Sequence, residues 1–330
     1  MNIAIVILNW NGRLLLEKFL PSVIKYSKEA TIYVADNAST DDSVAYIGDS
    51  FPTVQIIQNK INGGYAKGYN DALEKIDADI FCLLNSDIEV TENWLLPIIS
   101  VFQSSDKVAA VQPKILDSKK KTHFEYAGAA GGFIDRLGYP YCRGRIFDTL
   151  EEDVNQYNDT IDIFWASGAC LFIKKVVFYE VGKLDEDFFA HQEEIDLCWR
   201  IQNRGYQIKY QGNSTVYHLG GATLNTMNPK KTFLNFRNNL LMMVKNISGV
   251  QVWCIISIRL ILDGIAGIKY IMDKKPSHCV AILRAHFSFY KNLPAFIKKR
   301  KKESNSKKYY SILSVVWQYY ILNKKHFKQL

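Results

Sequence analysis

The first hundred residues alternate short, almost unbroken apolar runs with amphipathic stretches. Apolar runs that lack polar alternation predict strands buried on both faces, and strands separated by helices are typical of a parallel sheet. We therefore predict an α/β fold with helices on both faces of the sheet. The predicted strands are residues 3–8, 31–35, 54–58, 80–84 and 108–112, and the predicted helices lie around 14–26, 65–75 and 94–103.

Polar clusters follow four of these strands. They are residues 9–11, 36–37, 59–64 and 85–87. Ligands of open α/β sheets bind beyond the carboxyl ends of the strands, so these clusters predict one binding site along that edge.

The remaining chain divides into two regions. Residues 119–162 are rich in Gly and Tyr and indicate loops with short hairpins. The composition changes near residue 226, so we predict an α/β body at 1–225 and a helical, basic region at 226–330. Within the body, later strands are expected at 161–165, 169–174, 207–211 and 215–218, and a helix at 192–204.

Charge is distributed unevenly along the 330 residues. The net charge is +8, but residues 250–330 carry 16 Lys and Arg against three acids, which leaves the body at −5. A basic tail on a slightly acidic body favours an anionic partner, either a lipid surface or nucleic acid. An apolar segment at 250–272 and the aromatic residues at 317–320 favour the membrane surface.

Residues 250–272 have nearly the length of a membrane span. They contain Arg259, Asp263 and Lys269, and each charge at the bilayer centre would cost roughly 2.5–3.5 kcal/mol. A helix lying in the membrane interface or packed on the body fits better, although the length also allows a span.

Two features indicate a reducing compartment. The six cysteines form no CxxC pair and mostly have apolar neighbours, so buried thiols are expected. The first apolar run, 3–8, is too short for a signal-peptide core and is expected to be a strand.

Two segments suit a nucleotide diphosphate. Asp36 directly follows a strand, where a carboxylate can bind a ribose hydroxyl or a base N–H; the alternative is an Asx turn that caps the next helix. The glycine-rich turn at 62–70 offers backbone N–H groups to phosphate, or is an ordinary tight turn. It matches neither GxGxxG nor the P-loop, which argues against dehydrogenases and P-loop enzymes.

Two further side chains suit a divalent cation. Asp87, at the end of the triplet 85–87, can hold Mg²⁺ or Mn²⁺ beside donor phosphates, although such triplets also form turns. His218 ends a strand and can complete the metal site, whereas a lone histidine is often structural.

An acidic cluster at 185–197 enters a predicted helix. First-turn carboxylates commonly stabilise the helix dipole, and Asp196 with Arg200 can form an i,i+4 pair. The two aromatic residues in the same stretch indicate a cleft, where a carboxylate can act as a general base on a sugar hydroxyl.

Taken in order, these stretches resemble glycosyltransferase family 2 on the GT-A fold, a Rossmann-like α/β fold with a mostly parallel sheet. The nearest resemblance is to bacterial rhamnosyltransferase-like enzymes of surface-polysaccharide assembly. The matching motifs are VILNWNG (6–12), VADNASTDDS (34–43), NGGYAKGYN (62–70), LLNSD (83–87), WASGACLFIKK (165–175), FFAHQEEIDLCWR (188–200), YHLGG (217–221) and FRNNL (236–240).

The resemblance implies a role for each matched residue. Leu8, Asn9 and Asp36 would bind a uridine or thymidine nucleotide, and Gly64, Asn70 and Ser86 would lie along the donor. Asp87 and His218 would ligate the metal. Glu194 would be the base, with Glu193 as the alternative, because this chain has Glu where the family commonly has Asp. The acceptor side would include Trp165, Gly168 and Asp196.

The resemblance also implies an activity and a location. It predicts an inverting, metal-dependent transfer from a nucleotide-diphosphate sugar to a saccharide, with a lipid-linked acceptor as a hypothesis motivated by the tail. The enzyme would be cytoplasmic and peripheral on the inner face of the plasma membrane, with an anionic membrane surface and no nucleic acid as partner. Two alternatives remain at this point, namely a nucleotide-sugar-processing or nucleotidyl-transferring enzyme and a non-catalytic scaffold.

Overall fold

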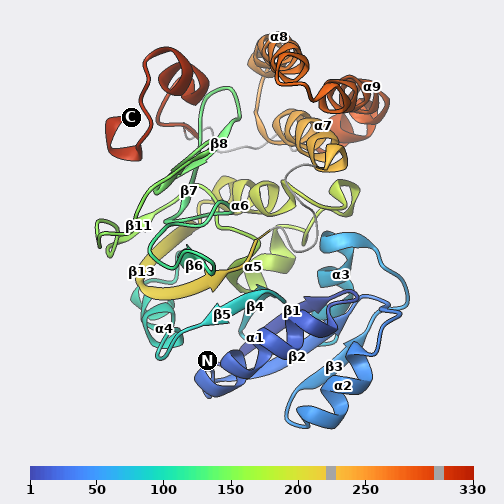
Figure 1. Ribbon diagram of the computed structural model, residues 1–330, viewed down its shortest axis with the longest axis vertical. Coiled ribbons are helices and arrows are strands. Elements are labelled where there is room, and N and C mark those ends of the chain that lie inside the picture. The colour runs from blue at the N-terminus through green and yellow to red at the C-terminus, as the bar shows by residue number, and fades with distance from the viewer. Residues whose placement is uncertain (221–227, 301–307) are drawn as a thin grey trace.

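A nine-stranded sheet forms the centre of the computed structural model, which describes residues 1–220, 228–300 and 308–330 (Figure 1). Its strand order is β11-β13-β6-β12-β4-β1-β2-β3, and β5 pairs with β13. The α/β prediction is confirmed, and each of the first five predicted strands is present. The bounds are β1 Ile3–Asn9, β2 Ala30–Asp36, β3 Gln55–Gln58, β4 Ile80–Asn85, β5 Ile88–Val90, β6 Val108–Asp117, β11 Thr160–Asp162, β12 Cys170–Lys174 and β13 Gln207–His218.

Parallel pairing joins the strands that bear the polar clusters. β1 lies between β2 and β4 and is parallel to both. In this register Asn9 is level with Asp36, and Leu8 is level with Asn85. The predicted clusters therefore meet at one edge of the sheet, as expected for the carboxyl ends of parallel strands.

The other half of the sheet contains antiparallel strands, and two of the strand predictions for this half need correction. β12 runs antiparallel to both β4 and β6, whereas β13 runs parallel to β6. The two strands expected at 207–211 and 215–218 are one strand, β13, whose register shifts after Gln211, opposite Pro113. Proline has no N–H to donate to the neighbouring strand, and a β-bulge opposite it lets β13 continue without that hydrogen bond. The strand expected at 161–165 is only Thr160–Asp162.

Helices cover both faces of the sheet. Apolar residues of α1, α2 and α4 pack on one face, and those of α3, α5 and α6 pack on the other. A sheet buried on both sides explains why its central strands lack polar alternation. The bounds are α1 Arg13–Tyr26, α2 Ser43–Ser50, α3 Gly64–Leu73, α4 Leu95–Ser104, α5 Lys175–Glu180 and α6 Glu193–Asn203.

A second small sheet lies beside the main one, in the region predicted as short hairpins. Its strands are β7 Gly132–Ile134, β8 Pro140–Cys142, β9 Arg145–Ile146 and β10 Thr149–Leu150. Residues near the C-terminus cover it, because Tyr141 and Ile146 form an apolar cluster with Val315 and Tyr319.

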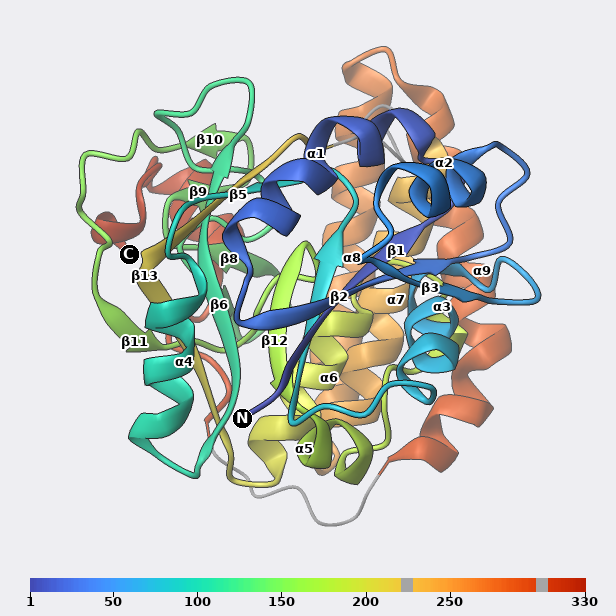
Figure 2. The ribbon, with the colours of Figure 1, turned by 90° about the horizontal axis from the view of Figure 1, so that it is seen from below.

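Three long helices form an outer layer over α6. They are α7 Pro229–Asn246, α8 Gln251–Met272 and α9 Pro276–Lys299, and Figures 1 and 2 show them side by side. α8 is long and apolar enough to cross a membrane. The boundary that we expected between 225 and 226 falls in 221–227, outside the described residues.

The cysteines follow the sequence expectation in part. None is in a disulfide, and Cys82, Cys142, Cys170 and Cys198 are buried. Cys279 is half-buried and Cys254 is exposed, because both lie in the outer helical layer.

Candidate active site

Asn9 and Asp36 form a buried corner at the ends of β1 and β2. The Asn9 side-chain amide donates to Asp36 Oδ1 at 3.2 Å and to Ser43 Oγ at 3.0 Å, and the Ser39 N–H donates to Asp36 Oδ2 at 3.0 Å. The last bond is local, as in the alternative offered for Asp36, but it reaches three residues on, and Asp36 does not cap the next helix, which begins at Ser43 after Asp42. A Cβ at Gly12 would lie 2.4 Å from Asn9 Oδ1, so only glycine fits beside this corner.

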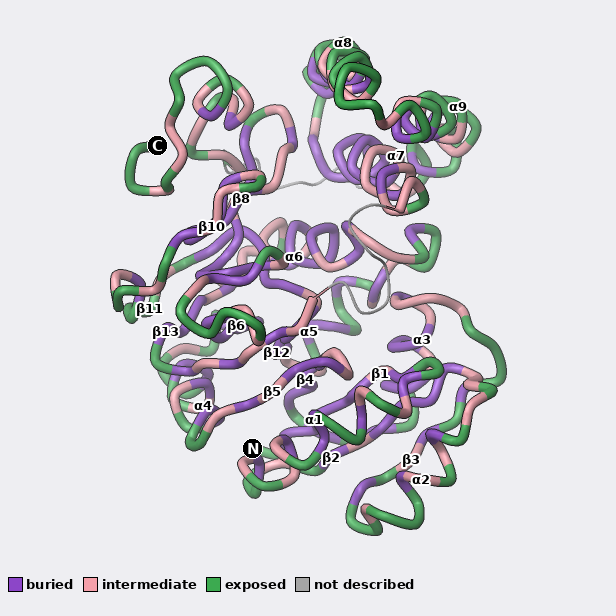
Figure 3. The backbone as a smooth tube through the Cα atoms, in the orientation of Figure 1, coloured by how far each residue is buried: buried purple, intermediate pink, exposed green. Residues whose placement is uncertain are grey.

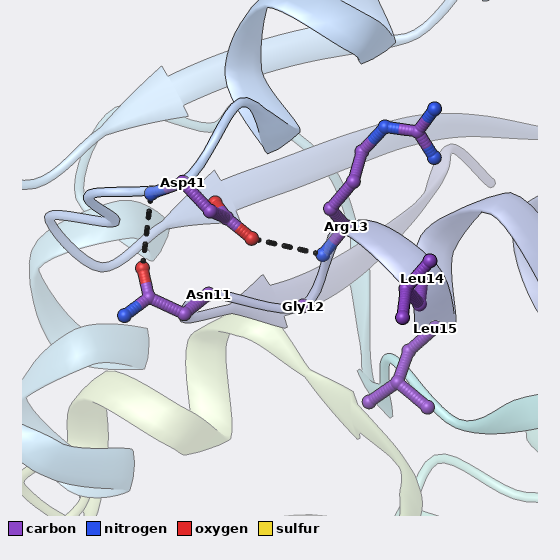
Figure 4. Close-up of a pocket in the computed structure, with 6 residues that line it drawn as sticks. All are labelled: Asn11, Gly12, Arg13, Leu14, Leu15 and Asp41. Atoms are coloured by element: carbon purple, nitrogen blue, oxygen red, sulfur yellow. Dashed lines mark hydrogen bonds between the residues drawn. The ribbon is translucent and has the colours of Figure 1, made fainter.

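A pocket of about 400 Å³ opens beside the corner, where the loops after β1 and β2 meet (Figure 4). The Arg13 N–H donates to Asp41 Oδ2 at 3.1 Å, and Asn11 Oδ1 accepts from the Asp41 N–H at 3.3 Å. Burial alone would raise the pKa of Asp41, but the Ser43 hydroxyl and the Arg13 N–H outweigh it and hold that pKa below its ordinary value. The sequence did not single out Asn11, Arg13 or Asp41, because their bridge joins two separate loops.

The glycine-rich turn before α3 has a different task from the phosphate cradle that we expected. Gly64 has φ +80°, and a Cβ there would lie 2.5 Å from the Phe189 carbonyl oxygen. The Gly64 N–H donates to Asn62 Oδ1 at 3.0 Å, and the Tyr65 N–H donates to the Phe189 carbonyl at 2.9 Å. Because both N–H groups are already used, the turn anchors the Phe189 loop instead of offering these donors to phosphate.

Asn70 also anchors a loop, which corrects its expected place along the donor. Its Nδ2 donates to the Leu184 carbonyl at 2.9 Å and to Glu186 Oε1 at 3.0 Å, and its Oδ1 accepts from the Leu184 N–H at 3.1 Å. The side chain is buried and its polar atoms are occupied. Asn70 therefore positions the segment that leads into the acidic cluster.

Asp87 and His218 lie together at the carboxyl edge of the sheet. β5 begins directly after Asp87 and pairs with β13 so that Ile88 is level with His218. His218 Nε2 is 3.1 Å from Asp87 Oδ1 and 3.4 Å from Asn85 Nδ2. Both side chains are buried. The carboxylate oxygen suits Mg²⁺ or Mn²⁺, whereas an imidazole nitrogen suits a transition metal, so the pair together favours Mn²⁺.

Glu125 faces the other side of the His218 ring. Its Oε2 is 3.2 Å from His218 Nδ1 and accepts a hydrogen bond from the Ala127 N–H. Burial alone would lower the pKa of His218, but Asp87 and Glu125 raise it to about 10. The described residues contain no cluster of three His, Cys, Asp or Glu side chains able to hold an ion by themselves. A metal held by Asp87 and His218 would need donor oxygens to complete its shell, and it would have to displace the proton from His218 Nε2.

Most acids of the 185–197 cluster have cationic partners. Asp185 contacts Lys245 at 2.7 Å and Lys299 at 2.6 Å, and Asp196 contacts Lys245 at 2.8 Å and Arg200 at 2.8 Å. Burial alone would raise the pKa of Asp185, but the two lysines outweigh it and lower that pKa to about 2. These acids are therefore ionised, structural members of the cluster.

Glu193 and Glu194 differ from their neighbours. Within the described part of the chain, the Oε2 atoms of both are buried and have no hydrogen-bond partner. Burial raises the pKa of Glu194 to about 7, and burial with the neighbouring charge of Glu194 raises the pKa of Glu193 well above its ordinary value. Glu194 is half-buried, whereas Glu193 is buried. Near neutral pH, Glu194 is therefore the carboxylate that can accept a proton.

The loop before these two glutamates is strained and is held by α7. Phe189, His191 and Gln192 all have positive φ, between 63° and 75°, which is costly for residues other than glycine. The Asn238 side-chain amide donates to the carbonyls of Phe188, Ala190 and His191 at 3.0, 2.9 and 2.7 Å. The FRNNL stretch, which had no assigned role in the sequence, thus fixes the entry to α6.

A short path of contacts links Glu194 to the Asp87–His218 pair. The Asn85 N–H, two residues before Asp87, donates to the Ala169 carbonyl at 3.0 Å. The neighbouring Gly168 accepts from the Tyr65 hydroxyl at 2.7 Å, and a Cβ at Gly168 would lie 3.7 Å from the Glu194 Cβ. Glu194 and the Asp87–His218 pair therefore border the same edge of the sheet, on either side of the 168–169 turn.

A sequence profile described as Glycosyl transferase family 2 matches residues 4–182, more than half of the chain. The chain belongs to glycosyl transferase family 2. It is therefore a glycosyltransferase, and the resemblance inferred from the motifs is confirmed.

Two curated relatives have related activities. The low-salt glycan biosynthesis hexosyltransferase Agl10 of Haloferax volcanii is 22% identical over 284 residues, which cover 83% of this chain and 86% of the relative. The N-acetylglucosaminyl-diphospho-decaprenol L-rhamnosyltransferase of Mycobacterium tuberculosis is 24% identical over 222 residues, covering 62% and 71%.

Solved structures confirm the GT-A fold. The mannosyltransferase PcManGT of Pyrobaculum calidifontis, in complex with GDP-Man and Mn²⁺, has a TM-score of 0.55 at 12% identity and covers 88% of this chain and 87% of that chain. GalNAc-T7 with UDP, GalNAc and Mn²⁺ has a TM-score of 0.57 at 17% identity, covering 74% and 47%.

Two of the residues expected on the acceptor side of this family 2 enzyme are structural. Asp196 is fully buried within its network of Lys245 and Arg200, so it cannot reach an acceptor. Trp165 is buried against Gly132, and its indole N–H donates to the Phe133 carbonyl at 2.8 Å.

The other predicted residues lie along the carboxyl edge of the sheet. Gly168 is half-exposed beside Glu194, and Leu8 and Ser86 are half-buried at the ends of β1 and β4. Glu125, Asn238 and Lys245 were not predicted, because each acts through a contact with a distant segment.

Proposed function

We propose that the chain is an inverting, metal-dependent glycosyltransferase that uses Glu194 as its base. The observation that carries this proposal is a carboxylate with a pKa of about 7 and an unpartnered buried oxygen, beside the turn that contacts Asn85 at the end of β4, two residues before Asp87. A base with a pKa near the working pH is the most effective, which favours Glu194 over Glu193.

In the proposed reaction, Glu194 takes the proton of an acceptor hydroxyl while that oxygen attacks the anomeric carbon. The new C–O bond forms on the face opposite the leaving nucleotide diphosphate, and the old C–O bond breaks with its electron pair on the diphosphate. Configuration inverts, and no covalent enzyme intermediate is needed. A divalent ion held by Asp87 and His218 would neutralise the charge on the leaving group.

The donor is proposed to be a UDP- or dTDP-sugar whose nucleotide lies near Asn9, Asp36 and the pocket at Asn11 and Asp41. Asp36, Asp41 and Asp87 are all acidic, so this edge of the sheet would repel a diphosphate. A diphosphate can therefore bind there only together with a cation. Mn²⁺ in two solved structures of this fold supports the choice of ion, with Mg²⁺ as the alternative.

The acceptor is proposed to be a lipid-linked saccharide in cell-surface polysaccharide synthesis. One relative is named for a diphospho-decaprenol acceptor, and another for glycan biosynthesis. Such an acceptor would place the enzyme at the cytoplasmic face of the plasma membrane. We further propose that the chain is divided into a catalytic region at 1–225 and a membrane-associated region at 226–330.

The test is a screen of nucleotide sugars for thermal stabilisation and for acceptor-dependent release of nucleoside diphosphate, with Mn²⁺, Mg²⁺ or chelator. We expect one donor to bind only with metal, and Asp87→Ala to abolish both binding of the ion and transfer. Indifference to every sugar nucleotide with metal present would overturn the proposal. Release of pyrophosphate, or conversion of the sugar without an acceptor, would instead favour a nucleotide-sugar-processing enzyme.

A further inference from the structure

Two of the three charged residues of α8, Arg259 and Asp263, point into the protein. Arg259 donates to the Leu137 carbonyl at 2.7 Å and to Asn239 Oδ1 at 2.5 Å. Asp263 is fully buried between Tyr139 and His286, at 3.4 and 3.3 Å. Two of the three charges that the sequence counted against a membrane span therefore lie on the inner face, where they hold α8 against the rest of the protein.

The exposed side chains of α8 are apolar except for Gln251, Ser257 and Lys269. Lys269, near the end of the helix, is the one exposed charge in α8, all of whose residues are described. The exposed positions recur every three or four residues, the spacing of a single helix face. They include Trp253, Cys254, Ile258, Ile261, Ile265, Ile268 and Met272.

The neighbouring helix α9 adds an apolar stripe and a basic stripe. Its exposed apolar residues again recur every three or four positions, and its exposed cations Arg284, Lys291 and Lys298 recur every seven. Residues seven apart lie nearly above one another on a helix, so the cations form one line. The apolar members are Val280, Leu283, Phe287, Tyr290 and Ile297.

Together these residues make one surface, which we call the α8–α9 face. The two helices contact each other, and Figure 3 shows their outer sides exposed at the end of the molecule away from β2 and β3. Near the end of α8, Tyr320 lies within electrostatic reach of Lys269. Tyr320 is exposed, as are Trp317 and Ile321 of the same short helical turn, Trp317–Ile321. Aromatic residues beside an apolar face are characteristic of membrane interfaces.

We propose that the α8–α9 face docks flat on an anionic bilayer, with α8 lying in the interface and not crossing it. The apolar stripes would enter the boundary between headgroups and acyl chains, and the basic line would contact anionic headgroups. A crossing would pull Arg259 and Asp263 away from their partners into hydrocarbon, where every polar group must be satisfied internally. This inference deepens the proposed function, since it names the surface that would meet a membrane-borne acceptor.

The first test is sedimentation of the full chain with phosphatidylcholine vesicles that contain or lack phosphatidylglycerol. We expect the chain to pellet with the anionic vesicles, more weakly as salt rises from about 0.1 M to about 1 M. The double variant Ile261→Glu with Ile265→Glu should bind the anionic vesicles at least tenfold more weakly. This is the order of effect expected when two charges are placed in an apolar face that enters the membrane. The matched control is Val176→Glu, an equally exposed apolar residue on α5, which should bind as wild type does.

The second test measures depth and orientation. An environment-sensitive probe on Cys254, in a Cys279→Ser background, should shift to the blue on anionic vesicles and be quenched by lipids labelled near the headgroup. Extraction at alkaline pH should release the protein. Quenching only by labels at the bilayer centre, together with resistance to extraction, would contradict the flat arrangement and indicate a span.

Partners other than a membrane on the α8–α9 face would give different results in these tests. A dimer in lipid-free solution that the Ile261/Ile265 variant dissociates would make the face an interface between two copies and overturn the proposal. Tight RNA retention without vesicle binding would overturn it as well. Vesicle binding does not require turnover, so failure here with normal transfer to a soluble acceptor would leave the proposed reaction intact.

Discussion

At the scale of single residues, the structure distinguishes Glu194 from the acids around it. Asp185 and Asp196 are neutralised by Lys245, Lys299 and Arg200, whereas Glu194 keeps an unpartnered oxygen. We predict that Glu194→Gln lowers kcat about 10²–10⁴-fold, the usual contribution of a general base, while donor affinity stays within about twofold. Single-turnover rates and donor titration measure the two effects. Loss of donor binding together with kcat would instead make Glu194 part of the donor site.

The pKa of about 7 for Glu194 gives a second signature. The rate should fall as pH drops below about 7, because the carboxyl group becomes protonated. Its folded pKa lies above the ordinary 4.5, so the native state binds more protons and the wild type loses stability as pH rises from about 4.5 to about 7. Glu194→Gln should therefore melt at a higher temperature than wild type at pH 8, and no higher at pH 4. Glu193→Gln is the control for the rate profile, and if it abolishes transfer while Glu194→Gln does not, the base is Glu193.

Glu125 gives a prediction about metal affinity. A carboxylate on the second ring nitrogen of a ligating histidine fixes the ring and its tautomer, and removing it commonly costs 10–100-fold in metal affinity. We expect Glu125→Ala to raise the Kd for Mn²⁺ by about this factor, with Glu125→Gln recovering part of it because an amide oxygen can occupy the place of Oε2, 3.2 Å from Nδ1. Titration followed by electron paramagnetic resonance measures this without turnover. An unchanged Kd with a lowered melting temperature would make Glu125 merely structural.

The sequence placed correctly those residues whose position follows from a strand end, and it could not show the distant contacts that occupy other candidate residues. Asp36, Asp87 and His218 directly follow or end strands, and parallel register brings such ends together. Asn70 and Asp196 have suitable chemistry, but their polar atoms are used by Leu184 and Lys245, which no local pattern shows.

At the scale of elements, the loop between the 3-10 turn at Glu186–Phe188 and α6 depends on α7. Asn238 holds three carbonyls of a loop that contains three residues with positive φ. We predict that Asn238→Ala lets this loop relax and lowers kcat by about tenfold or more, since an error of 1 Å in position can cost about 10²-fold. Donor affinity should be nearly unchanged. Kinetics with donor titration test this, with Asn292→Ala as control because that amide bonds only within α9.

Strands and helices were more predictable than the way they are joined. Continuous apolar runs identified β1 to β4 and β6, because burial on both faces leaves a strong local pattern. The single β13 was missed because its bulge opposite Pro113 resembles a loop in sequence. The role of α7 was missed because its contacts with the 188–192 loop join segments about 50 residues apart.

At the scale of the whole molecule, the basic C-terminal region has two tasks. The excess of 13 positive charges in residues 250–330 suggested that this region binds an anionic surface. The structure shows that Lys299 instead neutralises Asp185 and Asp187, and that Arg259 lies inside, while Arg284 and Lys291 remain on the exposed face. The region therefore completes the catalytic body and also supplies its proposed membrane surface.

This arrangement predicts that residues 226–330 cannot be removed without loss of the fold around the site. A fragment of residues 1–225 would leave Asp185 without either lysine and Asp196 without Lys245, and breaking a buried pair costs about 3–5 kcal/mol. Whole domains are stable by only about 5–15 kcal/mol. We expect the fragment to lack a cooperative thermal transition and donor binding.

In the full chain, Lys245→Met should lower stability by about 3 kcal/mol at pH 7 in urea unfolding, with the exposed Lys18→Met as control. The pKa of Asp185, lowered to about 2, stabilises the fold above about pH 4 and loses this effect as pH falls toward 2, so the gap between Lys245→Met and wild type should shrink in acid. A fragment that melts cooperatively at the wild-type temperature and binds donor would show that the site does not depend on α7 to α9.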